Sequence, residues 1–342
     1  VFKNLNELPS IYNEEFLAGF PPGEIFYHSE RGCKNSCKYC TLGPPLRFKD
    51  ISIVEKELKA IFDTRNITYV NIWDSDLTWD INRFKQILRM VDRFNKDGKK
   101  VSVNYGFLET DKEILELLGR NINRIIMGFQ STNKETTQLA GRAVYDLEHR
   151  REILEKAFEY IDPSRINAQF IFGLPGDNYE TLGESMRWAQ RIGFTDVWVV
   201  QNLALPGTLY RRDAEKYGIE YKKKPFYNVY KTNTFSKADM KKAKSTLFWY
   251  AGLGRSFNSP LLRSLAQRGV FLWDLAHRFP PADRKTVEEN LEGGDMYDYT
   301  LKVDRVSHIQ KLCLVMLQRL AAEDPAAKTA LDSLLTKEGC AV

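Results

Sequence analysis

The chain lacks any run of about eighteen apolar residues, so the sequence predicts no membrane-spanning helix. Its first residues lack the basic start, apolar middle and small-residue cleavage site of a signal peptide. The net charge is also small, at +5 over 342 residues. The lysines at 222–224 and 241–242 fit solvated faces. We therefore expect a cytoplasmic protein that binds neither membranes nor nucleic acids.

Cysteine is also scarce, with five residues in the whole chain, an odd number that argues against a disulfide framework. Low cysteine content suits a reducing compartment. Cys313 and Cys340 stand alone, and we expect a buried helical residue and a tail thiol, respectively. Cys33, Cys37 and Cys40, in contrast, form a compact C-x3-C-x2-C cluster directly after a strand-like segment.

This spacing favours an iron–sulfur site. Three thiolates in one short loop can bind three irons of a 4Fe–4S cluster and leave the fourth iron open. A structural zinc site would instead want four Cys or His ligands in paired spacings, and His28 fits no such pair. Structural zinc and incidental cysteines remain the alternatives.

Residues 24–203 alternate short apolar runs with amphipathic segments, which predicts repeated βα units and a parallel sheet of the α/β class. The predicted strands are Glu24–Ser29, Thr68–Trp73, Lys100–Gly106, Arg124–Phe129, Arg165–Phe172 and Asp196–Gln201. The predicted helices between them are Ile53–Asp63, Asp80–Asn95, Asp111–Leu118, Leu147–Tyr160 and Tyr179–Ile192. We expect residues 1–23 to be a linker and residues 204–342 to be a mostly helical extension that covers the substrate.

The cysteine loop, with Tyr39 just before its third cysteine, resembles the signature of the radical S-adenosylmethionine (SAM) superfamily. The resemblance implies a partial (β/α)6 barrel. It also implies that the cluster cleaves SAM reductively to a 5′-deoxyadenosyl radical, which abstracts hydrogen from the substrate. Cys33, Cys37 and Cys40 would then be the catalytic cluster ligands, and Tyr39 would lie near the adenine. An electron donor such as flavodoxin or ferredoxin is implied as a partner.

Further resemblances follow the later strands, where reactive groups of parallel-strand barrels collect. Asp74 and Asp76 stand where the family often has a glycine-glycine-glutamate run, and would accept hydrogen bonds from the SAM ammonium group. Their alternative role is to cap the following helix.

Gln130 and Ser131 match family residues near the SAM ribose or carboxylate, and Arg142 matches a basic residue that meets the carboxylate. The run Gly173-Leu174-Pro175-Gly176 resembles the loop whose backbone contacts the adenine. The alternatives are a polar strand end, a surface arginine and a plain turn.

An ordered set of short runs resembles the cobalamin-dependent subgroup of this family: Leu8-Pro9, Glu30-Arg31-Gly32-Cys33, Asp74-Ser75-Asp76 and Pro206-Gly207-Thr208. This implies a cobalamin-dependent methyltransferase acting on an unactivated carbon of a small-molecule or peptide substrate. The Asp-x-His-x-x-Gly run of base-off cobalamin domains is missing from the sequence. The sequence could be part of a longer protein, the enzyme could work without cobalamin, or it could bind cobalamin without this motif.

Two other functions remain open. The first is a cobalamin-independent radical SAM oxidoreductase or rearrangement enzyme. The second is a non-catalytic protein that binds zinc or a cluster.

Overall fold

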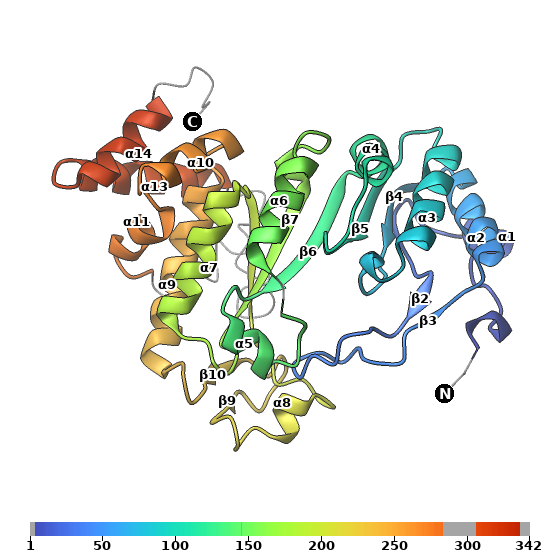
Figure 1. The fold of residues 1–342 in the computed structure, drawn as a ribbon, viewed down its shortest axis with the longest axis horizontal. Coiled ribbons are helices and arrows are strands. Elements are labelled where there is room, and N and C mark those ends of the chain that lie inside the picture. Colours follow the sequence, from blue (N-terminus) through green and yellow to red (C-terminus); the bar gives the residue numbers. More distant parts are fainter. Residues whose placement is uncertain (1–3, 145, 283–305, 336–342) are drawn as a thin grey trace. The chain divides into compact units, whose positions relative to one another are not determined.

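The computed structural model describes residues 4–144, 146–282 and 306–335. Six strands form one sheet in the order β1-β4-β5-β6-β7-β8 (Figure 1). Their bounds are β1 Gly23–Tyr27, β4 Ile67–Ile72, β5 Lys100–Asn104, β6 Arg124–Gln130, β7 Ile166–Phe172 and β8 Asp196–Gln201. The pairs β1 with β4, β4 with β5, β5 with β6 and β7 with β8 are parallel. The predicted α/β class and partial barrel of parallel strands are confirmed.

The helices between these strands form where apolar residues recur at helical spacing. In α3, Ile81–Phe94, the buried residues include Phe84, Ile87 and Leu88, and the Asp80 side chain caps the first turn by accepting from the Arg83 N–H at 2.9 Å. The other helices are α1 Glu14–Ala18, α2 Ile51–Asp63, α4 Lys112–Asn121, α5 Lys134–Leu139, α6 Leu147–Ala157 and α7 Tyr179–Ile192. The predicted helices are confirmed to within a few residues at their ends.

A short ribbon that was not predicted frames the cysteine loop. Strands β2, Glu30–Arg31, and β3, Arg47–Phe48, pair antiparallel with Glu30 opposite Phe48. The chain between them carries all three cysteines of the cluster. Strands of two residues are too short to leave an alternating pattern in the sequence.

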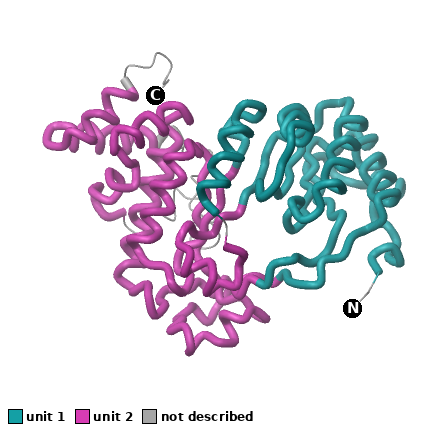
Figure 2. The backbone as a smooth tube through the Cα atoms, in the orientation of Figure 1, with its two compact units in different colours: residues 1–36, 42–127, 145–166 teal, residues 37–41, 128–144, 167–342 magenta. Residues whose placement is uncertain are grey.

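The chain divides into two compact units, coloured separately in Figure 2. Unit 1 comprises residues 1–36, 42–127 and 145–166, and unit 2 comprises residues 37–41, 128–144 and 167–342. In unit 1 the buried ring of Tyr105 packs against those of Phe84 and Phe107, with ring centres 4.8 and 4.6 Å away. In unit 2 the ring of Phe129 stacks on that of Phe170, with centroids 5.4 Å apart. The expected boundaries at residues 23 and 203 remain predictions.

The expected helical extension is present in unit 2. Its described helices include α8 Leu209–Arg212, α9 Lys237–Gly254, α10 Ser259–Gln267, α11 Leu272–Arg278, α13 Val306–Ala321 and α14 Pro325–Leu335, and a small ribbon pairs β9 Glu220–Tyr221 with β10 Val229–Lys231. Cys313 is buried within α13, as expected, and Cys340 lies outside the described residues. None of the described helices combines the length and apolar character needed to cross a bilayer.

Candidate functional site

In unit 1, Cys33 stands directly after β2. Its backbone N–H donates to the Gly43 carbonyl at 3.1 Å, and its Sγ accepts a hydrogen bond from the Asn35 N–H at 3.4 Å. The preceding Gly32 has a φ of +95°, and a Cβ added there would lie 2.2 Å from the Pro45 carbonyl oxygen. This turn therefore requires glycine both for its backbone conformation and for its packing.

We expect Gly32→Ala to damage the cysteine loop more than Gly98→Ala does. Gly98 also has a positive φ, +66°, but an added Cβ meets no atom within 4 Å, so the pair separates backbone strain from collision. The collision at Gly32 should lower the free energy of unfolding by about 2 kcal/mol more than the control. Urea denaturation and the iron content after reconstitution measure the difference. Equal values in both variants would show that the close approach to Pro45 is unimportant.

Two buried carboxyl groups hold the start of the cysteine loop in unit 1. The Asp74 carboxyl accepts hydrogen bonds from the Ser29 N–H at 2.7 Å, the Ser29 Oγ at 2.6 Å and the Glu30 N–H at 3.2 Å. Glu30 Oε1 in turn accepts from the Ser75 N–H at 2.9 Å and the Ser75 Oγ at 2.7 Å. These bonds join the chain before Cys33 to the segment that follows β4.

Both carboxyl groups hold their protons more tightly than usual. Burial raises the pKa of Asp74 to about 6. Burial also raises the pKa of Glu30 to about 7, and the negative charge of Asp74 adds to that rise. Because the Asp74 carboxyl already accepts three hydrogen bonds inside the protein, its main visible role is to position residues 29 and 30. Its predicted contact with the SAM ammonium group stays a prediction.

The two carboxylate oxygens of Asp76 differ in their hydrogen bonds. Its Oδ1 accepts from the Thr78 N–H at 3.0 Å, the Thr78 Oγ1 at 2.6 Å and the Gly106 N–H at 3.0 Å, and so caps the short 3-10 helix Leu77–Trp79. Its Oδ2 accepts no hydrogen bond from any described residue. A Cβ added at Gly106 would lie 2.7 Å from that oxygen, so glycine keeps this space open. The sequence reasoning missed Gly106, although a glycine just after a strand at this sheet edge was a usable signal.

In unit 2, Lys38 anchors the segment that carries Cys37 and Cys40. Its N–H donates to the Ala140 carbonyl at 2.9 Å, and its carbonyl accepts from the Tyr210 N–H at 2.9 Å. Its Nζ donates to the Leu139 carbonyl at 2.7 Å. Cys37 is buried, and the Cys40 N–H donates to its carbonyl at 3.1 Å. No local sequence pattern points to Lys38, because its partners lie far along the chain.

Arg142 lies beside Cys37. Its Nη1 is 3.9 Å from Cys37 Sγ, within the range of a hydrogen bond to sulfur, and its Nη2 donates to the Gly128 carbonyl at 2.8 Å. Burial raises the pKa of the Tyr39 hydroxyl well above its usual range, and the positive charge of Arg142 offsets part of that rise. The structure therefore places Arg142 beside the segment that contains Cys37, Tyr39 and Cys40. The predicted contacts of Tyr39 and Arg142 with SAM stay predictions.

Gln130 and Ser131 form a strained corner at the end of β6. Gln130 has a φ of +71°, which is uncommon for a residue other than glycine. Its side chain folds back over Gly128, where an added Cβ would lie 2.5 Å from Gln130 Nε2. Ser131 is buried, and its Oγ accepts from the Asn133 N–H at 3.1 Å. Strain of this kind persists where the surroundings hold a residue in place, often at functional sites.

The run Gly173-Leu174-Pro175-Gly176 forms a tight turn after β7, with φ values of +81° at Gly173 and +88° at Gly176. The Asn202 Nδ2 donates to the Gly173 carbonyl at 3.0 Å, and the Gly176 N–H donates to Thr234 Oγ1 at 2.9 Å. Both glycines are thus in a conformation that other residues rarely adopt. Adenine contact by this turn remains a prediction.

Asp177, which follows this turn, should make stability depend on pH. Burial raises its pKa from an ordinary 3.8 to about 7, although Thr181 Oγ1 donates a hydrogen bond to it. Burial favours the protonated form of Asp177, so its contribution to stability is fully present below pH 3.8, the ordinary pKa. That contribution is lost progressively as the pH rises from there to about 7, the folded-state pKa. In urea titrations, Asp177→Asn should reduce the loss of stability between these pH values, which amounts to about 1.4 kcal/mol for each pH unit between the unfolded-state and folded-state pKa. An unchanged slope would contradict this assignment.

The free thiols of Cys33, Cys37 and Cys40 are the donor type that an iron–sulfur cluster takes. No group of three or more His, Cys, Asp or Glu side chains within the described ranges is arranged to hold one metal ion. A 4Fe–4S cluster makes a different demand, because each iron takes its own thiolate. Cys33 Sγ and Cys37 Sγ both already accept hydrogen bonds from N–H groups, as cluster-bound sulfurs do.

One family model matches the part of the chain that carries most of these residues. The family model "Radical SAM superfamily" matches residues 28–189. No curated protein sequence matches the chain.

Solved structures share the fold at low sequence identity. The methyltransferase TsrM from Kitasatospora setae, solved with tryptophan substrate and a SAM analogue, is 16% identical over 91% of this chain and 54% of its own, with a TM-score of 0.51. Coproporphyrinogen III oxidase from Escherichia coli is 17% identical over 59% of this chain and 50% of its own, with a TM-score of 0.46. The chain thus spans about half the length of these proteins.

Proposed function

We propose, from the match of residues 28–189 to the radical SAM family model, that this chain cleaves SAM reductively and uses the product radical to methylate an unactivated carbon. The observation that carries the first half is the cysteine loop, in which Cys33 Sγ and Cys37 Sγ accept hydrogen bonds from the protein. When bound, the cluster supplies the electron that breaks the carbon–sulfur bond of SAM. A reductant such as flavodoxin or ferredoxin, in a reducing cytoplasm, completes the proposal.

The residues of the chain have separate roles in this proposal. Cys33, Cys37 and Cys40 hold the cluster, and the guanidinium of Arg142 offsets the negative charge of the Cys37 thiolate. On the SAM side, the open Oδ2 of Asp76 would accept from the ammonium group.

The remaining assignments rest on the backbone and on polar side chains. The turn at 173–176 would present backbone groups to the adenine. Gln130 and Ser131 would lie near the ribose or carboxylate, and Asp74 would act by holding residues 29 and 30 in place.

Two observations support methyl transfer over other radical reactions. The first is the ordered set of short runs that resembles the cobalamin-dependent subgroup, from Leu8-Pro9 to Pro206-Gly207-Thr208. The second is the fold shared with TsrM, a methyltransferase, over 91% of this chain. Cobalamin, when bound, would supply the methyl group. The substrate in this proposal is a small molecule or a peptide.

The test is anaerobic reconstitution with iron and sulfide, with and without hydroxocobalamin, followed by reduction in the presence of SAM. S-adenosylhomocysteine is the product left when SAM gives up its methyl group. We expect this product only in samples that contain cobalamin, measured by mass spectrometry. If 5′-deoxyadenosine forms and S-adenosylhomocysteine never does, the enzyme is instead a cobalamin-independent oxidoreductase or rearrangement enzyme.

A further inference from the structure

Unit 2 contains a cavity of about 390 Å³ at the carboxyl end of β8. This volume falls in the range of small-molecule sites. Four lysines line it, Lys222, Lys237, Lys241 and Lys244, together with the amide side chains of Gln201 and Asn228. No Asp or Glu is among the described residues of its lining. The charged side chains of the described lining are therefore all positive.

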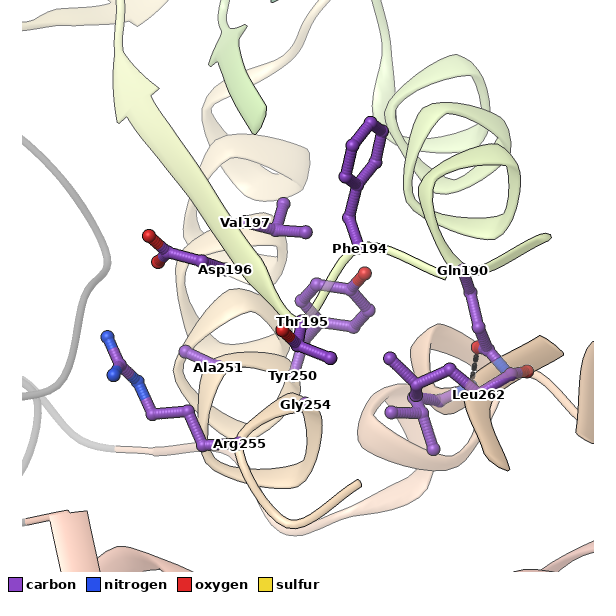
Figure 3. A pocket seen from close by; sticks show the side chains of 11 residues that line it. Gln190, Phe194, Thr195, Asp196, Val197, Tyr250, Ala251, Gly254, Arg255 and Leu262 are labelled. Atoms are coloured by element: carbon purple, nitrogen blue, oxygen red, sulfur yellow. Dashed lines mark hydrogen bonds between the residues drawn. The ribbon is translucent and has the colours of Figure 1, made fainter. Parts of the chain in front are cut away.

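A second cavity of unit 2, drawn in Figure 3, has a different character. It measures about 20 Å³, room for about one water molecule, and Asp196 places it at the amino end of β8. Its Gln190 side chain is already satisfied, since Nε2 donates to the Val270 carbonyl at 2.8 Å and Oε1 accepts from the Leu272 N–H at 2.8 Å. This smaller cavity is a gap in packing. The catalytic ends of parallel strands are their carboxyl ends, where the lysine-lined cavity lies.

Three of the four lining lysines lie on one face of α9. Lys237, Lys241 and Lys244 follow one another at spacings of four and three residues, so their side chains emerge on the same side of the helix. Like charges at these spacings destabilise a helix. Glu220 offsets part of this charge through a 2.8 Å ion pair with Lys237, whereas Lys241 makes no ion pair within the described residues. A bound anion would give Lys241 an opposite charge.

The cavity adjoins the turn that follows β7. Met240 belongs to the cavity lining, and its Cε would lie 2.6 Å from a Cβ added at Gly173. Gln201, which also lines the cavity, donates through Nε2 to the Val229 carbonyl at 2.6 Å, and the next residue, Asn202, donates to the Gly173 carbonyl. Only the Met240 side chain would thus separate a ligand held by the lysines from the turn at 173–176, which we propose contacts SAM.

We propose that this cavity binds the anionic group of the enzyme's substrate, and that the group is compact and multiply charged, either a phosphate ester or a polycarboxylate. The inference rests on the proposed function, because it assigns the substrate of that reaction. Lysine commonly binds phosphate oxygens as a point charge, whereas arginine binds carboxylates and phosphates alike through its planar fork. The cationic residues of the described lining are all lysines, so a phosphate ester is the form that we test first.

The test is calorimetric titration of the reconstituted enzyme with pyrophosphate and, separately, with tricarballylate, at low ionic strength. Cluster absorbance is recorded before and after, so that loss of iron to the probe is detected. Lys241→Gln should weaken binding about tenfold, the effect of one charge-assisted hydrogen bond. Lys241→Arg, which keeps the charge, should restore most of it.

The matched control is Lys242→Gln, which removes the same charge one residue away. Lys242 does not line the cavity, and its Nζ lies 4.1 Å from the centre of the Tyr179 ring. The Lys242→Gln variant should bind the probe as tightly as the unaltered enzyme does. Binding of pyrophosphate alone supports a phosphate ester, and binding of tricarballylate alone supports a polycarboxylate.

Two results would overturn the inference: binding of neither probe by the unaltered enzyme, or equal weakening in Lys241→Gln and Lys242→Gln. The first result would mean that the cavity does not bind anions, and the second would mean that the lysines act only through diffuse surface charge. SAM cleavage, measured on the same preparation, separates this inference from the proposed function. Cleavage without probe binding refutes the cavity alone, and probe binding without cleavage refutes the proposed function while supporting the anion site.

Discussion

Replacing Cys37 with alanine is expected to reduce both cluster content and 5′-deoxyadenosine formation to background. The substitution removes one of three thiolates, and a cluster held by two thiolates loses a ligand that its irons require. It also removes the sulfur beside the Arg142 guanidinium, which would leave a positive charge facing an empty space. Iron and sulfide analysis, visible absorbance and mass spectrometry of the SAM products measure the effect.

Cys313→Ala is the matched control for this experiment. Cys313 is also a buried free thiol, but it lies in α13, where its Sγ donates to the Trp249 carbonyl at 3.8 Å. This variant should bind as much iron as the unaltered protein and form as much 5′-deoxyadenosine. Full cluster content in Cys37→Ala, or equal losses in both variants, would contradict the assignment of the cysteine loop.

Asp74→Ala is expected to lower the free energy of unfolding by about 3 kcal/mol or more. The Asp74 carboxyl is 1% exposed and accepts from the Ser29 N–H, the Ser29 hydroxyl and the Glu30 N–H. Alanine would leave these donors without an acceptor in a place where water has little access. Each unsatisfied donor therefore destabilises the folded state. Urea denaturation gives the change in stability, and iron content shows whether the loop that begins at residue 29 still binds its cluster.

Two further variants make this result specific. Asp74→Asn keeps one carbonyl acceptor and should lose less stability than Asp74→Ala. Asp63→Ala removes a carboxylate whose side chain is 60% exposed, and its ion pair with Lys59 should be worth less than about 1 kcal/mol. A loss below that level in Asp74→Ala would mean that the buried hydrogen bonds do not hold the loop.

The sheet and its covering helices could be predicted closely because their signals are local. The helix Tyr179–Ile192 and the strand Asp196–Gln201 have the predicted ends. In that helix the Asn178 side chain accepts from the Thr181 N–H, and Gly193 ends it in a left-handed conformation with φ +92°. Helix caps and apolar spacing both depend on residues that are close in the sequence, so they can be predicted without knowledge of the fold.

The contacts that position the candidate site could not be predicted, since they join distant residues. Asp74 reaches back to Ser29, and Lys38 reaches forward to Leu139 and Tyr210. The cysteines were found because covalent spacing alone puts them in one loop. The lysines at 222 and 241 fit solvated faces in the sequence, and the fold brings both to one cavity lining.

The most direct test of the central claim is SAM cleavage by the unaltered protein. The protein is reconstituted anaerobically with iron and sulfide, reduced, and incubated with SAM, and 5′-deoxyadenosine is measured by mass spectrometry. We predict that 5′-deoxyadenosine accumulates with the unaltered protein and stays at background with Cys37→Ala. A fully loaded cluster that yields no 5′-deoxyadenosine, even with phosphorylated and polycarboxylate compounds present as trial substrates, would contradict the account and favour a non-catalytic cluster-binding protein.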